Sequence, residues 1–308
     1  MKLFNLTTFL FILFFISCKK TKDYVGGIAP PYQIPSPYQE PVWHPNGQIL
    51  GFNHTPYKLV ANQNPTQFID SAGFWLINAS GTDKRRVLNF RANSPAWSPD
   101  GNWLAYSDGA TIYKIRFTGT SFDLSQNVSL TSNGKNFFPC WNATSDSLVF
   151  DSNDGTNDGS YRTWKMASDG TGKTLVGVGR QPRWSANHIY FIGSDSPGVG
   201  IFRVNTNSQN KIKIVNQPNE PNNIRSLRIW NNYLFYQLDG LGINKGTINS
   251  ANFFSITTEE ISNYGFDISL QGKIAYVLYN GKVTTTQGTI WIMNNDGTGK
   301  KQLTYTNY

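Results

Sequence analysis

The sequence predicts an all-β fold, a six-bladed β-propeller with four antiparallel strands in each blade. Composition and an internal repeat carry this prediction. The chain has 308 residues, of which 39% are hydrophobic, 14% aromatic and only 15% charged. This composition excludes a disordered chain, a coiled coil and a long helical bundle. One motif recurs six times at spacings of 54, 44, 43, 45 and about 39 residues. A period of about 40 to 45 residues that contains several short strands is typical of propeller blades.

Residues 1–17 are predicted to be a lipoprotein signal peptide. An apolar run from Leu3 to Ile16 follows Met-Lys and is too short for a comfortable membrane span. Residues 15–18, Phe-Ile-Ser-Cys, are similar to a bacterial lipobox, in which the cysteine is acylated and becomes the mature N-terminus. We therefore expect lipidation at Cys18, and two or three acyl chains give an essentially permanent anchor. The alternative is an ordinary signal sequence that happens to contain a cysteine.

Residues 18–38 are predicted to be the lipidated cysteine and a Pro-rich tether, because the stretch 24–41 contains five prolines. The propeller then covers residues 39–308. We expect the protein in the bacterial cell envelope, anchored to a membrane and either periplasmic or surface-exposed. The formal charge is +8, but Lys and Arg are spread along the chain, so no nucleic-acid partner is predicted.

Each repeat has the same predicted order of strands. Pro-x-Trp begins the innermost strand, a turn such as Ser-Pro-Asp-Gly at 98–101 follows, and an apolar run such as Leu-Ala-Tyr forms the second strand. The anchor positions, which carry the Trp or its equivalent, are Trp43, Trp97, Trp141, Trp184, Ile229 and Ile268. Third strands are expected at 73–78, 111–115, 161–166, 200–204 and 289–293. Gly-containing hairpin turns follow at 80–81, 169–170 and 296–297, and Leu-Thr at 130–131 and 303–304 marks the outer strand.

These repeats resemble the TolB-like, PD40 (WD40-like) β-propeller repeats over about residues 39–308. The resemblance implies that the anchor Trp residues are structural and fill the space between blades. TolB carries an additional α/β domain before its propeller, whereas only the tether precedes the first repeat here. The role of TolB in the Tol system is therefore not carried over.

No catalytic residue, cofactor or metal site is predicted. His44, His54 and His188 fall in turns or loops of different elements and lack metal-ligand spacing. TolB-like propellers that act as pectate-fragment lyases use a cluster of central histidines, which does not map onto this chain. The Asp-rich stretch 151–159 could suggest a calcium loop, but the order of its oxygen ligands is not that of an EF-hand. The alternative is a polar connection between strands.

Ligand-binding candidates come from two sets of equivalent positions on the innermost strands. The rim position, four residues before each anchor, holds Gln39, Asn93, Phe137, Arg180, Arg225 and Tyr264. The pre-anchor position, one residue before each anchor, holds Val42, Ala96, Cys140, Arg183, Arg228 and Asp267. The charged members could form an anion or carboxylate site, with Arg180 and Arg225 at its rim. The alternative is a structural Arg–Asp pairing that satisfies the pore.

Two long connections, Asn53 to Ala72 and Gln237 to Ala251, are expected to join second to third strands on the face of the mouth, where loops often bind partners. The sequence therefore predicts an envelope lipoprotein that acts as a non-catalytic binding or scaffold propeller for a protein or glycan partner. The alternative is a glycan-active lyase or hydrolase with its site at the propeller mouth.

Overall fold

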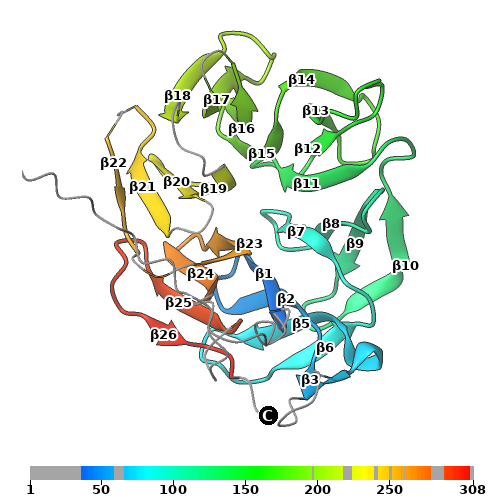
Figure 1. Cartoon of the computed structure of the whole chain (residues 1–308). Coiled ribbons are helices and arrows are strands. Elements are labelled where there is room, and N and C mark those ends of the chain that lie inside the picture. The colour runs from blue at the N-terminus through cyan, green and yellow to red at the C-terminus, as the bar shows by residue number, and fades with distance from the viewer. Residues whose placement is uncertain are drawn as a thin grey trace, which may run out of the picture. The chain divides into compact units, whose positions relative to one another are not determined.

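The computed structural model describes residues 36–58, 66–195, 198–217, 224–238, 242–249, 252–257, 259, 261–278 and 288–305. The signal peptide, Cys18 and most of the tether lie outside these residues. Within them, six four-stranded antiparallel sheets surround a central axis (Figure 1). The predicted six-bladed propeller is therefore confirmed. In the same residues, no helix is long and apolar enough to cross a membrane.

The first three blades run from the inner strand to the outer strand in sequence order. Blade 1 contains β1 (Tyr38–Trp43), β2 (Ile49–His54), β5 (Gly73–Asn78) and β6 (Arg85–Leu88). Blade 2 contains β7 (Asn93–Trp97), β8 (Trp103–Ser107), β9 (Ile112–Phe117) and β10 (Phe122–Ser129). Blade 3 contains β11 (Asn136–Trp141), β12 (Ser147–Ser152), β13 (Arg162–Ala167) and β14 (Thr174–Val178).

The other three blades follow the same order. Blade 4 contains β15 (Arg180–Ser185), β16 (His188–Ser194), β17 (Val199–Asn205) and β18 (Ile212–Gln217). Blade 5 contains β19 (Ile224–Trp230), β20 (Tyr233–Leu238), β21 (Ile243–Thr247) and β22 (Phe253–Ser255). Blade 6 contains β23 (Ile261–Ile268), β24 (Lys273–Leu278), β25 (Ile290–Asn294) and β26 (Lys301–Gln302). A small hairpin, β3 (Tyr57–Lys58) and β4 (Thr66–Gln67), and a 3-10 turn, η1 (Ile69–Ser71), lie in the connection between β2 and β5.

The innermost strands of blades 1 to 4 are bent by a β-bulge just before the anchor. The pairing register of β1 with β2 shifts between Gln39 and Val42, and the residue between them, Glu40, has a φ of 53°. Equivalent left-handed residues in blades 2 to 4 are Ser94, Phe138 and Gln181, and each precedes a proline. Proline has no N–H to give to the ladder and is tolerated in strands at bulges and edges. The repeated Pro-x-Trp motif therefore encodes a bulge as well as a strand.

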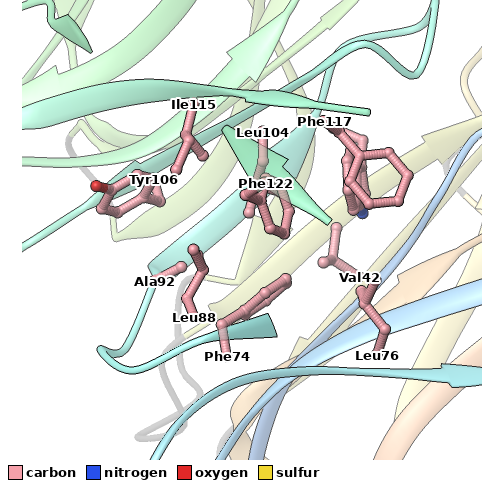
Figure 2. Packing of buried hydrophobic residues seen from close by; sticks show 11 residues of the cluster. Val42, Phe74, Leu76, Leu88, Ala92, Leu104, Tyr106, Ile115, Phe117 and Phe122 are labelled. Atoms are coloured by element: carbon pink, nitrogen blue, oxygen red, sulfur yellow. The ribbon is translucent and has the colours of Figure 1, made fainter. Parts of the chain in front are cut away.

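The core consists of six apolar clusters, one at each junction between neighbouring blades. Figure 2 shows the junction of blades 1 and 2, where Phe74 and Leu76 of β5 face Leu104 of β8 and Phe122 of β10. The anchor Trp97 completes this cluster and is 7% exposed. The other anchors lie in the other five clusters in the same way. Each anchor packs against the preceding blade, as the resemblance implies, and a buried indole contributes about 150–250 Å² of contact area.

The hairpin turns between third and outer strands also join neighbouring blades. A Cβ added to Gly170 in blade 3 would lie 2.7 Å from the Leu130 carbonyl oxygen of blade 2. A Cβ added to Gly297 in blade 6 would lie 2.1 Å from the Ile256 carbonyl oxygen of blade 5. Both glycines have positive φ values, 89° and 85°. Glycine is required there for its backbone conformation and for the close approach of the next blade.

Side-chain contacts close the ring, because each blade is built from one contiguous segment of the chain. The junction of blades 6 and 1 has the apolar cluster of Tyr38, Trp43 and Leu303. The Tyr38 hydroxyl donates to the Tyr305 carbonyl at 3.1 Å, and the Lys301 ammonium donates to the Ser80 carbonyl at 3.2 Å. Among the described residues, no strand of the first blade pairs within the sheet of the last blade, or the reverse.

The predicted third strands are confirmed, with ends that differ by one or two residues. The Leu-Thr pairs come directly after the outer strand, and their threonines bind the third strand of the same blade. Thr131 Oγ1 accepts a hydrogen bond from the backbone N–H of Ile112 at 2.9 Å, and Thr304 Oγ1 accepts one from Ile290 at 2.8 Å. Each threonine thus satisfies the first N–H of a third strand.

The expected long loop from Gln237 to Ala251 is wrong. The third strand of blade 5, β21, lies inside this range and pairs with β20 from Tyr233↔Thr247 to Gln237↔Ile243. The stretch is rich in Gly and Asn, which favours a loop interpretation. Gly246 is needed inside the strand because a Cβ there would lie 2.4 Å from the Phe253 ring.

Candidate functional site: the central cavity

The six innermost strands enclose a cavity of about 440 Å³ on the propeller axis. It reaches the surface at the turns between first and second strands, where Pro99 and Leu270 are exposed. Its wall is largely apolar and includes all six anchors. The charged residues of the wall are Glu40, Arg183, Arg225, Arg228 and Asp267.

Pre-anchor side chains reach from one blade to the innermost strand of the next. Asp267 Oδ2 accepts a hydrogen bond from the Trp43 backbone N–H at 2.7 Å. Cys140 Sγ accepts one from the Trp184 backbone N–H at 3.4 Å. An innermost strand has an unpaired edge whose polar groups need partners. The pre-anchor residues therefore serve the same backbone function in blades 3 and 6 with different chemistry.

The charged pre-anchor residues of blades 4 to 6 form a continuous polar chain. Arg183 Nε donates to the Leu227 carbonyl of blade 5 at 2.9 Å, and its Nη1 donates to the Pro182 carbonyl at 2.8 Å. Arg228 Nε is 2.7 Å from Asp267 Oδ1, and both side chains are less than one-fifth exposed. The structure thus brings Arg183, Arg228 and Asp267 together, and the Arg228–Asp267 pair is the structural pairing that the sequence left as an alternative.

Arg183 differs from Arg228 because it lacks an ion-pair partner among the described residues. Burial, followed by the charge of the neighbouring Arg228, lowers the pKa of Arg183 to about 9. Both causes act against the charged guanidinium. The guanidinium of Arg183 therefore lies in the cavity wall with no contacting carboxylate among the described residues.

The rim positions are not gathered around the cavity as expected. Of the rim residues with described side chains, Arg225 alone contributes to the wall, whereas Arg180 is exposed. Phe137 packs its ring 6.4 Å from Phe138 and 6.0 Å from Tyr161. The side chain of Tyr264 lies outside the described part of the structure. In blades 1 to 4 the bulge lies directly after the rim position, and it shifts the alternation of side chains away from the axis. In blade 5 the register shift lies at Arg225 itself, between Ile224 and Ser226.

Two carboxyl groups that bind the start of the next blade, Glu40 in the cavity wall and Asp151 in β12, were missed by the sequence analysis. Glu40 accepts hydrogen bonds from the Ser94 N–H at 2.8 Å and from Asn53 Nδ2 at 2.7 Å. Burial raises the pKa of Glu40. Asp151 is 2% exposed, accepts a hydrogen bond from the Gln181 N–H at 3.0 Å, and has no partner for Oδ1 in the structure. Burial raises the pKa of Asp151 to about 7.

The alignment of the repeats contains a pattern that points to Asp151. Polar residues near the ends of the second strands of blades 1, 2, 3 and 5 bind the start of the next blade. Asn53 makes a pair of hydrogen bonds with the Ala92 backbone at 2.8 and 2.9 Å, and Ser107 Oγ donates to the Asn136 carbonyl at 2.6 Å. Asp151 occupies the equivalent place in blade 3. We call this set, which also includes Gln237 of blade 5, the inter-blade clasps.

The histidines have structural contacts. His44 Nε2 is 3.1 Å from the Gly101 carbonyl oxygen, and its ring centroid lies 4.7 Å from that of Trp97. His54 is not a loop residue but the buried end of β2, stacked 4.2 Å from the Tyr38 ring. Burial lowers the pKa of His54 to about 4. Among the described residues, no three His, Cys, Asp or Glu side chains are grouped to hold a metal ion.

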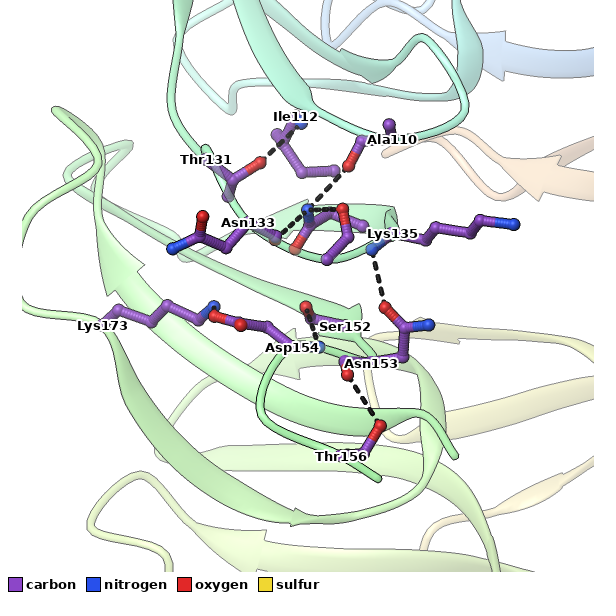
Figure 3. A network of polar contacts seen from close by, with 12 residues as sticks. Ala110, Ile112, Thr131, Asn133, Lys135, Ser152, Asn153, Asp154, Thr156 and Lys173 are labelled. Atoms are coloured by element: carbon purple, nitrogen blue, oxygen red, sulfur yellow. Dashed lines mark hydrogen bonds and ion pairs between the residues drawn. The ribbon is translucent and has the colours of Figure 1, made fainter. Parts of the chain in front are cut away.

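In the Asp-rich stretch 151–159, Asp151 and Ser152 belong to β12, and residues 153–159 form part of the polar connection from β12 to β13. In Figure 3, Asn153 Oδ1 accepts a hydrogen bond from the Lys135 N–H at 2.7 Å, and Asp154 pairs with Lys173 at 2.7 Å. The Thr156 hydroxyl donates to the Asn153 carbonyl at 2.7 Å. These contacts bind the connection to the segment that leads into β11 and to the turn before β14.

The fold and the axial cavity define a six-bladed β-propeller. No known family profile matches the sequence, and no curated protein matches it either. Solved structures match clearly, and they identify the fold as that of TolB and related PD40 (WD40-like) propellers. TolB from Acinetobacter baumannii has a TM-score of 0.61 at 15% sequence identity, and the match covers 82% of this chain and 63% of that one. The chain therefore spans less than two-thirds of that TolB.

Two other solved structures show how widely this fold is used. The β-propeller domain of the Trilobed protease from Pyrococcus furiosus, described as having an open velcro topology, has a TM-score of 0.53 at 13% identity, with 88% of this chain and 98% of that chain covered. An oligogalacturonate lyase in complex with manganese has a TM-score of 0.52 at 11% identity, with 85% and 75% covered. At such identities the likeness establishes the fold alone.

Proposed function

We propose that this protein is a lipid-anchored envelope lipoprotein whose propeller is a non-catalytic binding scaffold for a protein or glycan partner, with the central cavity as the binding site. The observation that carries the proposal is the cavity itself. A concave, mostly apolar site with a few convergent polar groups is the usual form of a ligand pocket. Here the indoles of Trp141 and Trp184 supply the apolar surface, and Arg183 supplies an unbalanced charge.

The carboxylates of the cavity wall already have hydrogen-bond or ion-pair partners within the protein, which supports binding over catalysis. Both oxygens of Asp267 are bonded, to Arg228 and to the Trp43 N–H. Both oxygens of Glu40 are bonded as well, to Ser94 and Asn53. A general acid or base must reach the proton that it transfers. These two carboxylates are committed to holding the innermost strands.

A glycan-active lyase or hydrolase is the second candidate. It is supported by the raised pKa of Glu40 in the cavity wall and by the fold shared with the oligogalacturonate lyase. Glu40→Gln distinguishes the two candidates. If the protein degrades polysaccharide and Glu40→Gln abolishes that activity while the fold is retained, the enzyme hypothesis replaces the binding scaffold.

The binding proposal is tested by affinity capture from solubilised native envelopes. We expect Leu270→Arg, at the opening of the cavity, to reduce recovery of the partner at least tenfold. Leu124→Arg is the matched control, because Leu124 is 63% exposed on β10 and Leu270 is 68% exposed. A third variant replaces the connection 55–72, where Phe68 and Ile69 are exposed, with a short turn. Loss of recovery in this third variant alone would move the binding site from the cavity to that connection.

Lipid anchoring is tested separately at Cys18. The Cys18→Ala variant should remain unlipidated, because the acyl chains need the cysteine thiol. We expect loss of fatty-acid labelling and a shift from the detergent phase to the aqueous phase. Unchanged labelling and unchanged partitioning would contradict the lipoprotein assignment and leave the binding proposal untouched.

A further inference from the structure

The unbalanced charge of Arg183 distinguishes one part of the cavity wall. Arg228 lies beside it but is neutralised by Asp267 at 2.7 Å, and Arg225 has a partner of its own. Within the described part of the chain, Arg183 donates to two carbonyl oxygens, those of Leu227 and Pro182. Removing a cation from water without a counter-ion is unfavourable, so a site of this kind favours a bound anion.

The remaining donors of Arg183 are suited to a carboxylate. A guanidinium has five N–H donors, and the two carbonyls use one at Nε and one at Nη1. One N–H on Nη1 and both on Nη2 remain for a ligand, and guanidinium groups bind carboxylates with paired N–H donors. One unbalanced positive charge is matched by a monoanion, whereas a phosphate dianion would leave a negative excess.

The surroundings of Arg183 indicate the rest of the ligand. Trp184 follows it in β15, and Cys140, Trp141 and Ile229 lie in the same cavity wall. These side chains offer apolar and aromatic surface. A ligand with an apolar body would bury that surface, and the gain is about 25 cal/mol for each Å² removed from water.

We propose that the central cavity binds a small organic carboxylate, with the carboxylate on the Arg183 guanidinium and an apolar or aromatic body against the tryptophan wall. The inference rests on the proposed binding function and specifies its ligand class. It assigns Arg183 as the specificity-determining residue and Arg228 as part of the structure.

The test compares benzoate with benzamide, which has the same shape and no charge. Binding is measured by titration calorimetry and tryptophan fluorescence on the full-length protein in nanodiscs. We expect benzoate to bind at least tenfold more tightly than benzamide, and at least tenfold more tightly than acetate, which has no apolar body. Equal affinities for benzoate and benzamide, or no binding of either, would overturn the anion site. An equal affinity for acetate would overturn the apolar body.

The variants separate Arg183 from its neighbours. Arg183→Gln should abolish the preference for benzoate over benzamide, and Arg183→Lys should retain part of it because the charge is kept. Arg180→Gln is the matched control, since Arg180 is exposed and lies outside the cavity wall. A full preference for benzoate in a folded Arg183→Gln protein would overturn the assignment.

Two outcomes separate the ligand class from the proposed function. If benzoate does not bind but recovery of the partner still depends on Leu270, the ligand class is wrong and the proposed function stands. If benzoate does not bind and Leu270→Arg leaves recovery of the partner unchanged, both are wrong.

Discussion

The two halves of the ring solve the same structural problem with opposite chemistry. In blades 1 to 3 the pre-anchor residues are Val42, Ala96 and Cys140, whereas in blades 4 to 6 they are Arg183, Arg228 and Asp267. Both sets face the innermost strand of the next blade, and Cys140 and Asp267 accept the same anchor N–H in their respective junctions. The comparison shows that the contact between a pre-anchor side chain and the next innermost strand requires a hydrogen-bond acceptor or apolar packing, and does not require a charge. The Arg228–Asp267 pair is explained by the fold, whereas the charge of Arg183 has to be explained by something else.

The largest expected difference between the halves is at the anchors. Trp141 is 5% exposed and its indole N–H donates to the Ala96 carbonyl at 3.0 Å, whereas the equivalent Ile229 is only partly buried. We expect Trp141→Ala to lower the free energy of unfolding by about 4 kcal/mol and Ile229→Ala by about 2 kcal/mol, because the larger side chain leaves the larger cavity. Chemical denaturation of the two variants measures this. Equal losses would show that the junctions do not depend on the size of the anchor.

The next effect concerns the charged half. Asp267→Asn should lower the free energy of unfolding by about 3 kcal/mol, because Arg228 and Arg183 would then lie close together without a carboxylate. The amide oxygen can still accept the Trp43 N–H, so the loss reports the charge. Cys140→Ser is the control in the neutral half and should cost less than about 1 kcal/mol, because it retains an acceptor for Trp184.

The charge interpretation can also be tested in a double variant. Replacing Arg228 with Met in the Asp267→Asn background should recover part of the lost stability, since it removes the unpaired cation. No recovery would mean that the carboxylate acts through packing alone, and the contrast between the two halves would lose its electrostatic basis.

The smallest predicted effect compares two inter-blade clasps, Asn53 in blade 1 and Asp151 in blade 3. The pKa of Asp151 rises from 3.8 to about 7 on folding, so the folded state favours its protonated form. The destabilisation is absent below pH 4, grows between pH 4 and 7, and is constant above pH 7, with about 1.4 kcal/mol for each unit of pKa shift. We expect Asp151→Asn to raise the free energy of unfolding by about 2 kcal/mol at pH 8, because it removes the buried charge. The gain is smaller than the full pKa shift implies, because the new amide N–H groups need acceptors. At pH 4 the variant should gain little.

Asn53→Asp is the reciprocal variant and should have the opposite pH dependence. The new carboxylate would face the Ala92 carbonyl and Glu40, both of which are acceptors, so stability should fall as the pH rises through its pKa. Unfolding free energies measured from pH 4 to 8 test both variants together. A flat profile for Asp151→Asn relative to wild type would contradict the buried, protonated state.

The alignment of six repeats predicted the propeller because each repeat marks the same local events. Pro-x-Trp predicted an innermost strand, and the glycine turns at Gly170 and Gly297 predicted hairpins, because Pro and Gly restrict or extend the backbone at single positions. Blade 5 shows the limit of this reasoning. Its third strand at Ile243–Thr247 has Gly and Asn where other blades have aromatic residues, and only the pairing with β20 makes it a strand.

The candidate site was predicted in part for the same reason. The pre-anchor residues Arg183, Arg228 and Asp267 share one repeat position, so the sequence alone was enough to expect them together. The rim residues Arg180 and Phe137 share a position too, but the bulge that follows it turns them away from the cavity. Glu40 and Asp151 were missed because their burial depends on the neighbouring blade, which is distant in sequence.

The sequence by itself determined the strand order, the number of blades and the positions of the anchors, because these follow from local backbone preferences repeated at a fixed period. Only the tertiary structure decided which charges are balanced. Arg228 and Arg183 occupy the same repeat position, and a carboxylate of the next blade neutralises one and not the other. Pairing depends on distances of a few ångströms between separate blades, and a one-dimensional pattern does not contain those distances.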